Sequence, residues 1–399
     1  VNVHNYSFLK DNDMINQVKV RVSYGQTGKV NFPSYSAKTV YATNDRWYAT
    51  GFGTQLKALG NHNLKWETTN KLNMGTDLQF WNERISLNFD YYYNKTVDLI
   101  TDVSLPASAG FTSYKDNLGE TLNKGFDIQV RFDVYKDKDW NVSLWGNLNH
   151  NRNEILKISD ALRAYNDRVN EKYEAAEDAQ GNVNLSAYGS EYSEPEMKYE
   201  EGASLTSIFA IRSLGIDPMT GNELFLYRDG SVSSLWKATE TVRVGDEEPK
   251  ASGSFGVNLT YKNLTLFASF AYDWGKQTYN QTLVDGVENA DIENSNVDRR
   301  VLTQRWQKPG DIAPLRNIKD MNTSTMPTSR FVQDDNELSL SALTLSYDFN
   351  TDWLKKIRLK MLRLELSTND LFRASTVRQE RGTSYPFART FNFSLRATF

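Results

Sequence analysis

The sequence alternates apolar and polar side chains over one segment after another, and this pattern restricts the fold more than any other feature. In 126–134, for example, every second residue is apolar and the residues between are polar or charged. Successive side chains of a β-strand point to opposite faces, so the alternation predicts strands with one apolar and one polar face. Ten such strands are predicted, most of them about 8–12 residues long, which is the length that a tilted strand needs to cross a bilayer. They lie at 18–24, 72–80, 85–93, 126–134, 140–148, 254–261, 264–274, 338–349, 362–368 and 391–399.

The connections between these strands are of two kinds. Short connections at 81–84, 135–139, 262–263 and 350–357 join strands into hairpins, and much longer segments separate the hairpins. Soluble domains rarely contain many loops longer than about 15 residues. Short turns at one end and long loops at the other are typical of an outer-membrane β-barrel. The long segments are 26–66, 94–125, 152–253, 275–330 and 370–388.

Two local patterns refine this outline. The alternation shifts by one residue near Ala342, which predicts a β-bulge. In the longest loop, apolar residues recur at three- or four-residue spacing and predict one helix, whose start Ser159 or Asp160 would cap. These apolar residues are Ile158, Leu162, Tyr165, Val169 and Tyr173.

The positions of the aromatic rings favour a membrane barrel over a soluble β-sandwich. Aromatic residues make up 13% of the chain, although its hydrophobic fraction is only 39%. A sandwich would place large rings in the middle of its strands, whereas a barrel places them in two girdles at the bilayer interfaces. Many rings here lie at strand ends beside turns, and examples are Tyr24, Trp81, Trp140, Tyr261, Trp274 and Tyr347.

The composition excludes several classes of function. The 46 basic and 50 acidic residues give a net charge of −4, which provides no basic excess for nucleic acid. The chain has no cysteine and only three histidines, so thiol catalysis, disulfides and Cys-based zinc sites are excluded. The acidic residues are scattered over polar strand faces and form no catalytic pair. We therefore expect a protein that is not an enzyme.

One acidic loop, 285–298, could bind calcium through carboxylate oxygens. Its spacing matches no EF-hand loop, so we predict a solvated acidic loop and no cofactor, with calcium as the alternative. The carboxylates are Asp285, Glu288, Asp291, Glu293 and Asp298.

Five short motifs occur in order along nearly the whole chain: RVSYGQTG at 21–28, GNHNLKWE at 60–67, NLGETLNKG at 117–125, GIDPMTGN at 215–222 and YPF at 385–387. Each motif alone is weak, but the ordered set resembles the SusC/RagA family of TonB-dependent outer-membrane transporters. His62 departs from the family, which usually has proline at that position.

The resemblance implies an all-β fold, namely a transmembrane antiparallel barrel of about 22 strands whose lumen holds a plug. We expect the whole chain, 1–399, to be the C-terminal half of such a barrel. The plug domain, the TonB box and the first barrel strands would then lie outside this sequence.

The resemblance also implies a function. The intact protein would import oligosaccharides or peptides across the bacterial outer membrane, with a SusD-like surface lipoprotein as a lid and the TonB complex as the source of energy. Its other contacts would be outer-membrane lipid and, in a dimer, a second transporter–lid pair; nucleic acid is not expected. The alternative is a soluble or surface glycan-binding β-sandwich without transport activity.

Two sets of residues are predicted to carry this function. Rings in long loops can stack on sugar faces or pack against peptides, although they could instead pack the loops together or contact the lid. The predicted ligand-binding residues are Trp47, Tyr48, Phe52, Tyr188, Tyr192 and Trp236. The last strand ends on an aromatic residue and resembles the signal that the barrel-assembly machinery recognises, with Phe391, Phe393, Leu395 and Phe399 as its residues.

Overall fold

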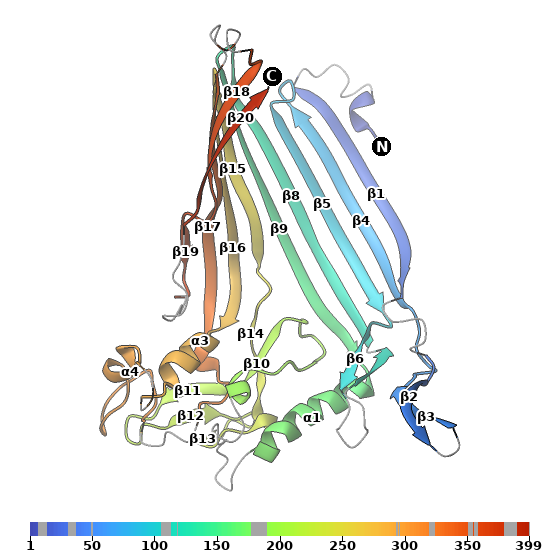
Figure 1. Ribbon diagram of the computed structural model, residues 1–399, viewed down its shortest axis with the longest axis vertical. Helices are drawn as coiled ribbons and strands as arrows, with labels where there is room; N and C mark the ends of the chain where they lie inside the picture. The colour runs from blue at the N-terminus through green and yellow to red at the C-terminus, as the bar shows by residue number, and fades with distance from the viewer. Residues whose placement is uncertain are drawn as a thin grey trace.

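The computed structural model describes residues 1–6, 14–30, 37–48, 51–104, 113–117, 119–176, 190–292, 294, 296–318, 324–349, 354, 358–378 and 389–398. Its main feature is one curved antiparallel sheet in which ten long strands follow one another in sequence order, and the short strand β19 (Arg373–Ser375) pairs with β17 (Figure 1). All ten predicted strands are therefore confirmed. They are β1 (Ile15–Lys29), β4 (Glu67–Phe80), β5 (Ile85–Val97), β8 (Gly119–Lys136), β9 (Trp140–Ile158), β15 (Ala251–Tyr261), β16 (Leu264–Tyr279), β17 (Val332–Phe349), β18 (Met361–Thr368) and β20 (Phe391–Thr398).

The predicted strand lengths are wrong for most of these strands. β8, β9 and β17 contain 18, 19 and 18 residues, well beyond the 8–12 that we expected. Their apolar alternation stops at the predicted bounds, but their backbones continue to pair with neighbouring strands toward the long loops. These strands end where their backbone hydrogen bonds to the neighbouring strands end. The hydrophobic pattern does not indicate this position.

The turns and the bulge follow the sequence. Trp81, Asn82 and Glu83 all have positive φ angles in the connection between β4 and β5, and Lys262 has one in the connection between β15 and β16. The register between β16 and β17 shifts next to Ala342, so the predicted bulge is confirmed.

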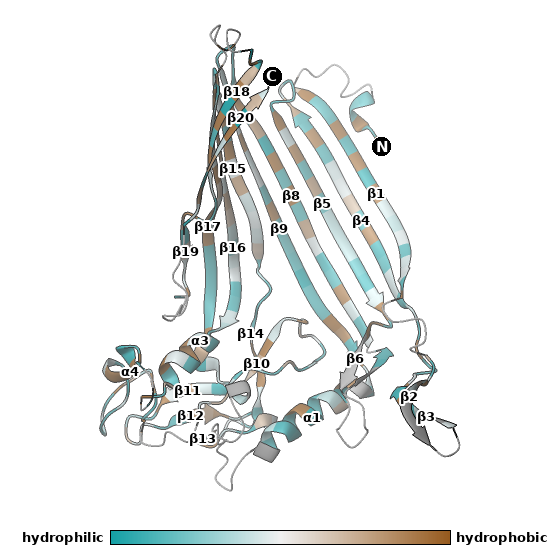
Figure 2. Ribbon diagram, in the orientation of Figure 1, coloured by the Kyte–Doolittle hydropathy of each residue, from teal (hydrophilic) through white to brown (hydrophobic). Residues whose placement is uncertain are grey.

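The two faces of the sheet differ in chemistry, as the alternating bands of Figure 2 show. On the polar face, Arg21 of β1 lies 2.7 Å from Asp77 of β4 and 3.0 Å from Asp90 of β5. Gly75 makes this possible, because a Cβ at that position would overlap both Arg21 and Asp90. Charges are thus paired with one another across three strands on the polar face.

The other face is apolar and carries rings near both ends of the strands. Phe126 and His150 are direct partners on β8 and β9, with ring centroids 5.2 Å apart. At the end with the short turns, the rings of Trp140 and Tyr261 lie 4.3 Å apart. The long strands form one sheet rather than two packed sheets, so the β-sandwich alternative is wrong.

The long loops fold into small elements at one end of the sheet (Figure 1). The predicted helix is confirmed as α1 (Asp160–Ala176), and the Ser159 hydroxyl accepts a hydrogen bond of 3.3 Å from the Leu162 amide at its start. No helix within the described residues is long and apolar enough to cross a membrane. The other elements are β2 (Val40–Tyr48), β3 (Gly51–Ala58), β6 (Ile100–Ser104), β7 (Ser113–Asn117), β10 (Ser207–Ala210), β11 (Arg212–Ile216), β12 (Glu223–Leu226), β13 (Val232–Ser233), β14 (Val242–Asp246), α3 (Gln281–Leu283) and α4 (Arg300–Thr303), with short turns η1 (Val3–Asn5), η3 (Ser190–Ser193), η4 (Ala238–Glu240), η5 (Val284–Glu288) and η6 (Ser329–Phe331).

A hydrophobic core joins α1 to the loop strands, and we call these packed loops the loop unit. Its centre is Tyr173, whose ring lies 5.0 Å from that of Trp236, and the Trp236 indole donates a hydrogen bond of 3.0 Å to the Pro327 carbonyl. This core holds residues from 152–253 and 275–330 together. Its buried members are Val169, Tyr173, Ile211, Phe225, Tyr227, Trp236, Ala238 and Met326.

We predict that Val130→Arg destabilises the barrel in a bilayer by about 2–4 kcal/mol, the cost of placing an arginine on the lipid-facing side near the midplane. Val130 lies on the apolar face of β8 and is 40% exposed. The neighbouring substitution Gln129→Arg places the same charge on the polar face and should cost much less. Denaturant unfolding in lipid vesicles measures both, and equal losses of stability would contradict the assignment of the faces.

Candidate ligand pocket in the loop unit

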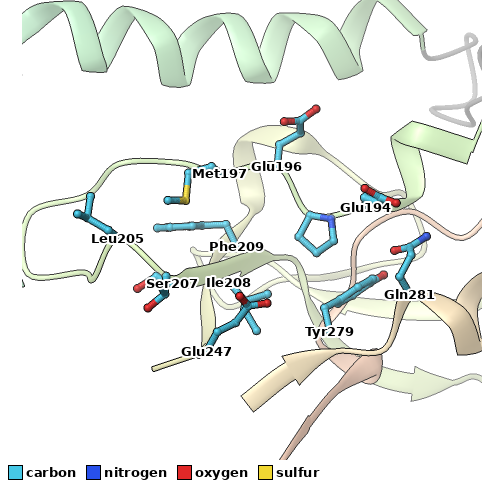
Figure 3. Close-up of a pocket in the computed structure, with 12 residues that line it drawn as sticks. Glu194, Glu196, Met197, Leu205, Ser207, Ile208, Phe209, Glu247, Tyr279 and Gln281 are labelled. Carbon is cyan, nitrogen blue, oxygen red and sulfur yellow. The ribbon is translucent and has the colours of Figure 1, made fainter. Parts of the chain in front are cut away.

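A pocket of about 410 Å³ lies where the two longest loops meet the end of β16 (Figure 3). Its first wall consists of residues 194–197 in the segment after α1, residues 205–209 in and just before β10, and Glu247 directly after β14. Its second wall consists of Tyr279 and Gln281, at the end of β16 and the start of α3. Segments far apart in sequence thus form one cavity at the loop end of the sheet.

Carboxylates dominate the charge of this pocket. Glu196 is paired with Lys172 of α1 at 2.5 Å, and Figure 3 shows its carboxyl group pointing toward the helix. Glu194 and Glu247 form no ion pair within the described part of the chain. Carboxylates accept hydrogen bonds but cannot donate them, so the lining favours ligands with ammonium, amide or hydroxyl donors and disfavours anions.

The remaining lining is largely apolar. Met197, Leu205, Ile208 and Phe209 lie on the first wall, and the Tyr279 ring faces the cavity from the second. Phe209 is itself buried and forms part of the packed wall rather than a free ring. An amphipathic ligand, with polar donors on an apolar framework, would match this mixture.

A small hydrogen-bond network holds Gln281 in place. Its amide nitrogen donates to the Ser193 hydroxyl at 2.7 Å and to the Asp285 carboxylate at 2.9 Å. Burial raises the pKa of Asp285, and the hydrogen bonds from Gln281 and Ser193 partly oppose this effect. The Gln281 carbonyl oxygen is buried and accepts no hydrogen bond from the residues that the structure describes.

A second cavity of about 480 Å³ lies beside the first, and Lys198 lines it. The ammonium group donates to the Asn170 side chain at 2.5 Å, to the Ala238 carbonyl at 2.9 Å and to the Thr241 hydroxyl at 2.5 Å. All three acceptors are neutral. Burial, followed by the charge of Arg228, lowers the pKa of Lys198 to about 8.

The structure places two of the predicted ligand-binding residues together, but away from the pocket lining. Tyr192 packs against the hydrophobic core with its ring 5.7 Å from that of Tyr173, and the Lys172 ammonium lies 4.9 Å from its centre. Trp236 is only 4% exposed and lies in the same core. Their rings therefore pack the loop unit together, which was the alternative that the sequence left open.

The structure describes the other predicted ligand-binding residues only in part or not at all. Trp47 and Phe52 are direct backbone partners in the β2–β3 hairpin, and Tyr48 pairs with Gly51, but their side chains lie outside what the structure describes. Tyr188 lies outside the described residues. Ligand binding by these residues stays a prediction.

The predicted assembly-signal residues lie on the last strand. Phe391, Phe393 and Leu395 alternate along β20 and pair with Thr368, Leu366 and Leu364 of β18, whereas Phe399 lies outside the described residues. All three side chains are exposed on one face of this strand. Recognition by assembly machinery stays a prediction.

The prediction of a solvated acidic loop at 285–298 is wrong for Glu288. This residue is 2% exposed, and its carboxylate lies 2.6 Å from the guanidinium of Arg330. This pairing could not be predicted, because the two residues are 42 positions apart in the sequence. Among the described residues, no group of three or more acidic or histidine side chains is arranged to hold a metal ion.

The residues that line the pocket could not be predicted, because they belong to segments without a strong periodic pattern. Glu194 and Glu196 lie in an irregular segment, and β10 contains only four residues. The excess of glutamates over 191–201 is the one signal that could have drawn attention to this region.

The chain is similar to a known family and to individual receptors. Residues 12–203 match the family described as TonB dependent receptor-like, beta-barrel. TonB-dependent receptor P3 of Formosa agariphila is 29% identical over 93% of this chain and 36% of its own length. TonB-dependent receptor SusC of Bacteroides thetaiotaomicron is 34% identical over 38% of this chain and 16% of its own length.

Solved structures share the fold. The RagAB peptide importer in the "open-open" state covers 100% of this chain with a TM-score of 0.76 and 22% identity, and the chain corresponds to 42% of that protein. A second structure, the RagAB peptide transporter, gives a TM-score of 0.75 at 23% identity. The chain thus spans about two fifths, or less, of the length of these relatives.

We predict that Lys198 makes the loop unit more stable as the pH rises from 8 to 9.5. Its pKa is about 8 in the folded protein and about 10.4 in an unfolded chain. The unfolded chain therefore binds more protons in this range, and stability rises with pH. Hydrogen exchange of α1, corrected for intrinsic rates, measures the effect.

Two variants make this test specific. Lys198→Met should remove the increase, whereas Lys237→Met, at an exposed lysine of the same unit, should keep it. The same pH dependence in Lys198→Met and in the unmodified protein would contradict the prediction.

Proposed function

Because the chain belongs to the TonB-dependent receptors of the outer membrane, we propose that it forms the C-terminal part of a SusC/RagA-type barrel that imports nutrients. In this proposal, residues 1–399 supply barrel wall and extracellular loops. A plug domain and the first barrel strands come from the rest of a longer protein. The proposal is supported most directly by the uninterrupted ten-strand sheet, one end of which carries a folded loop unit with a pocket.

The orientation in the membrane follows from the lengths of the connections. Outer-membrane barrels have short periplasmic turns and long extracellular loops. We therefore place the turn between β15 and β16 in the periplasm and the loop unit outside the cell. The pocket then meets a nutrient before it enters the lumen.

Import by such a protein needs partners that this chain does not contain. We propose that TonB supplies energy from the inner-membrane proton gradient by acting on the plug. A SusD-like surface lipoprotein would cover the loop unit as a lid, in a dimer of transporter–lid pairs. The contribution of residues 1–399 is binding and docking, and the absence of catalysis and of a cofactor stays a prediction.

The proposed substrates are oligosaccharides or peptides. Both carry many hydrogen-bond donors, which the carboxylates of Glu194 and Glu247 would accept. Both also offer apolar surface to Met197 and Tyr279. The lining disfavours polyanions such as sulfated glycans.

We predict that uptake of the substrate by cells depends on TonB, whereas its binding to the cell surface does not. Cells that express the intact transporter are supplied with fluorescent neutral oligosaccharides or with fluorescent peptides. Removal of TonB or collapse of the proton gradient should abolish uptake of the accepted class. Uptake that persists without TonB would indicate passive diffusion and contradict the proposal.

We also predict that Glu247→Gln weakens binding of a lysine-containing peptide by about two- to fivefold, the usual effect of one exposed charge. A neutral oligosaccharide should be affected less. Glu171→Gln, on the exposed surface of α1, removes the same charge away from the pocket and serves as the control. Titration calorimetry with the purified transporter measures all three, and equal effects of the two variants would show that Glu247 does not face the ligand.

A further inference from the structure

One buried segment, residues 327–331, connects the two walls of the pocket. The Ile211 amide donates to the Pro327 carbonyl at 3.2 Å, and the Ser329 amide donates to the Ile211 carbonyl at 2.9 Å. Ile211 directly follows β10, which carries Ile208 and Phe209 of the first wall. We call residues 327–331 the cross-strap.

The cross-strap also holds the second wall. The Asn280 amide donates to the Phe331 carbonyl at 2.9 Å, and Asn280 lies between the two residues of that wall, Tyr279 and Gln281. The ring of Tyr279 packs edge-on against that of Phe331, with centroids 6.1 Å apart. Thr328 and Phe331 are almost completely buried, so the cross-strap has little freedom to move by itself.

Arg330 fastens the cross-strap to both long loops. Its guanidinium lies 2.8 Å from the Glu223 carboxylate of β12 and 2.6 Å from the Glu288 carboxylate at the end of η5. It also donates to the Pro314 carbonyl at 2.7 Å. The three charged side chains are between 0% and 11% exposed, so water screens them little.

Other groups fix the orientation of the two carboxylates. The Thr328 hydroxyl donates to Glu223 at 2.6 Å, and the Thr325 hydroxyl donates to Glu288 at 3.2 Å. The guanidinium of Arg305 donates to the Val287 and Glu288 carbonyls at 2.7 and 2.8 Å. Arg330 therefore meets two carboxylates that are already held in place, and a buried arginine in such a site has one geometry.

We propose that Arg330 is a positioning residue for the ligand pocket, because its ion pairs with Glu223 and Glu288 fix the cross-strap and, through it, the separation of the two walls. Arg330 does not line the pocket, so it acts without touching a ligand. The inference rests on the proposed function only in taking this pocket as the ligand site. A second link, from the Asp246 amide to the Gln277 side chain at 3.3 Å, also joins β14 to β16. Loss of Arg330 should therefore loosen the walls rather than separate them.

Residues 1–399 contain no cysteine, which allows a direct test in the intact transporter after any cysteine in the rest of that protein has been replaced by serine. Spin labels are placed at Arg243→Cys, which pairs with Phe209 on the first wall, and at Thr282→Cys, next to Gln281 on the second. Both positions are exposed. Double electron–electron resonance then gives the distribution of distances between the walls.

With Arg330 present, we expect one narrow distribution. Arg330→Gln should broaden it about twofold and lower the affinity for a lysine-containing decapeptide about tenfold, and Arg330→Lys, which keeps the charge, should restore part of both. The control is Arg363→Gln, which breaks an equally short ion pair with Asp348 on the barrel wall, at 2.6 Å, and should leave both readouts unchanged. An unchanged distance distribution in Arg330→Gln would overturn the proposal.

If Arg330→Gln does not fold, a second variant provides the same test. The triple variant Glu223→Gln, Glu288→Gln and Arg330→Met removes these three charges together, so neither carboxylate is left buried without Arg330. It should give the same broad distribution as Arg330→Gln, and a narrow one would also overturn the proposal. The distance measurement needs no ligand, so broad distances without binding of the decapeptide would count against the proposed function and not against the role of Arg330.

Discussion

The fold depends on one constraint, which is that a backbone in lipid must satisfy every N–H and C=O group within the protein. The continuous pairing meets this requirement for the eight strands between β1 and β20, each of which has a neighbour on both sides. Beyond Asn149, the backbone of β9 does not pair with β15, and other groups accept hydrogen bonds from its amides. The Asn153 amide donates to the Glu248 carboxylate at 2.8 Å, and the Ile155 amide donates to the Ala203 carbonyl at 2.8 Å.

The same constraint leaves the side chains free to differ between the faces. Since the backbone is already satisfied, the polar face can carry charged pairs such as Arg21 with Asp77, and the opposite face can carry rings such as Phe126. Irregular structure is confined to the ends of the strands. The pocket that contains Glu194 and Glu247 accordingly lies in the loop unit, at the end of β16.

The wall could be predicted from sequence because its information is local. The period of two in 126–134, the phase shift at Ala342 and the capped helix at Asp160 each lie within a few residues of chain. The pocket could not be predicted, since Glu247 and Gln281 come together only through the packing of two long loops. Aromatic residues in the long loops did not indicate where the pocket lies, because the ring of Trp236, for example, packs in the hydrophobic core.

The buried charges of the loop unit explain why these loops form one body. Arg330 sits 107 residues from Glu223 and 42 from Glu288, and one side chain joins all three segments. Breaking a buried pair of this kind commonly costs about 3–5 kcal/mol, whereas an exposed pair contributes about 0–1 kcal/mol. The unit is therefore held at a few buried points rather than by its many surface charges.

The orientation of the barrel is tested most directly by the accessibility of single cysteines in intact cells. Residues 1–399 contain no cysteine, and any cysteine in the rest of the transporter is first replaced by serine. Ile312, at 94% exposure, lies in the loop unit, and Lys138 lies in the exposed short turn between β8 and β9. We predict that a membrane-impermeant maleimide labels Ile312→Cys in intact cells but labels Lys138→Cys only after the outer membrane is permeabilised. Labelling of Lys138→Cys in intact cells, or protection of Ile312→Cys, would contradict the assignment of the loops to the outside and the turns to the periplasm.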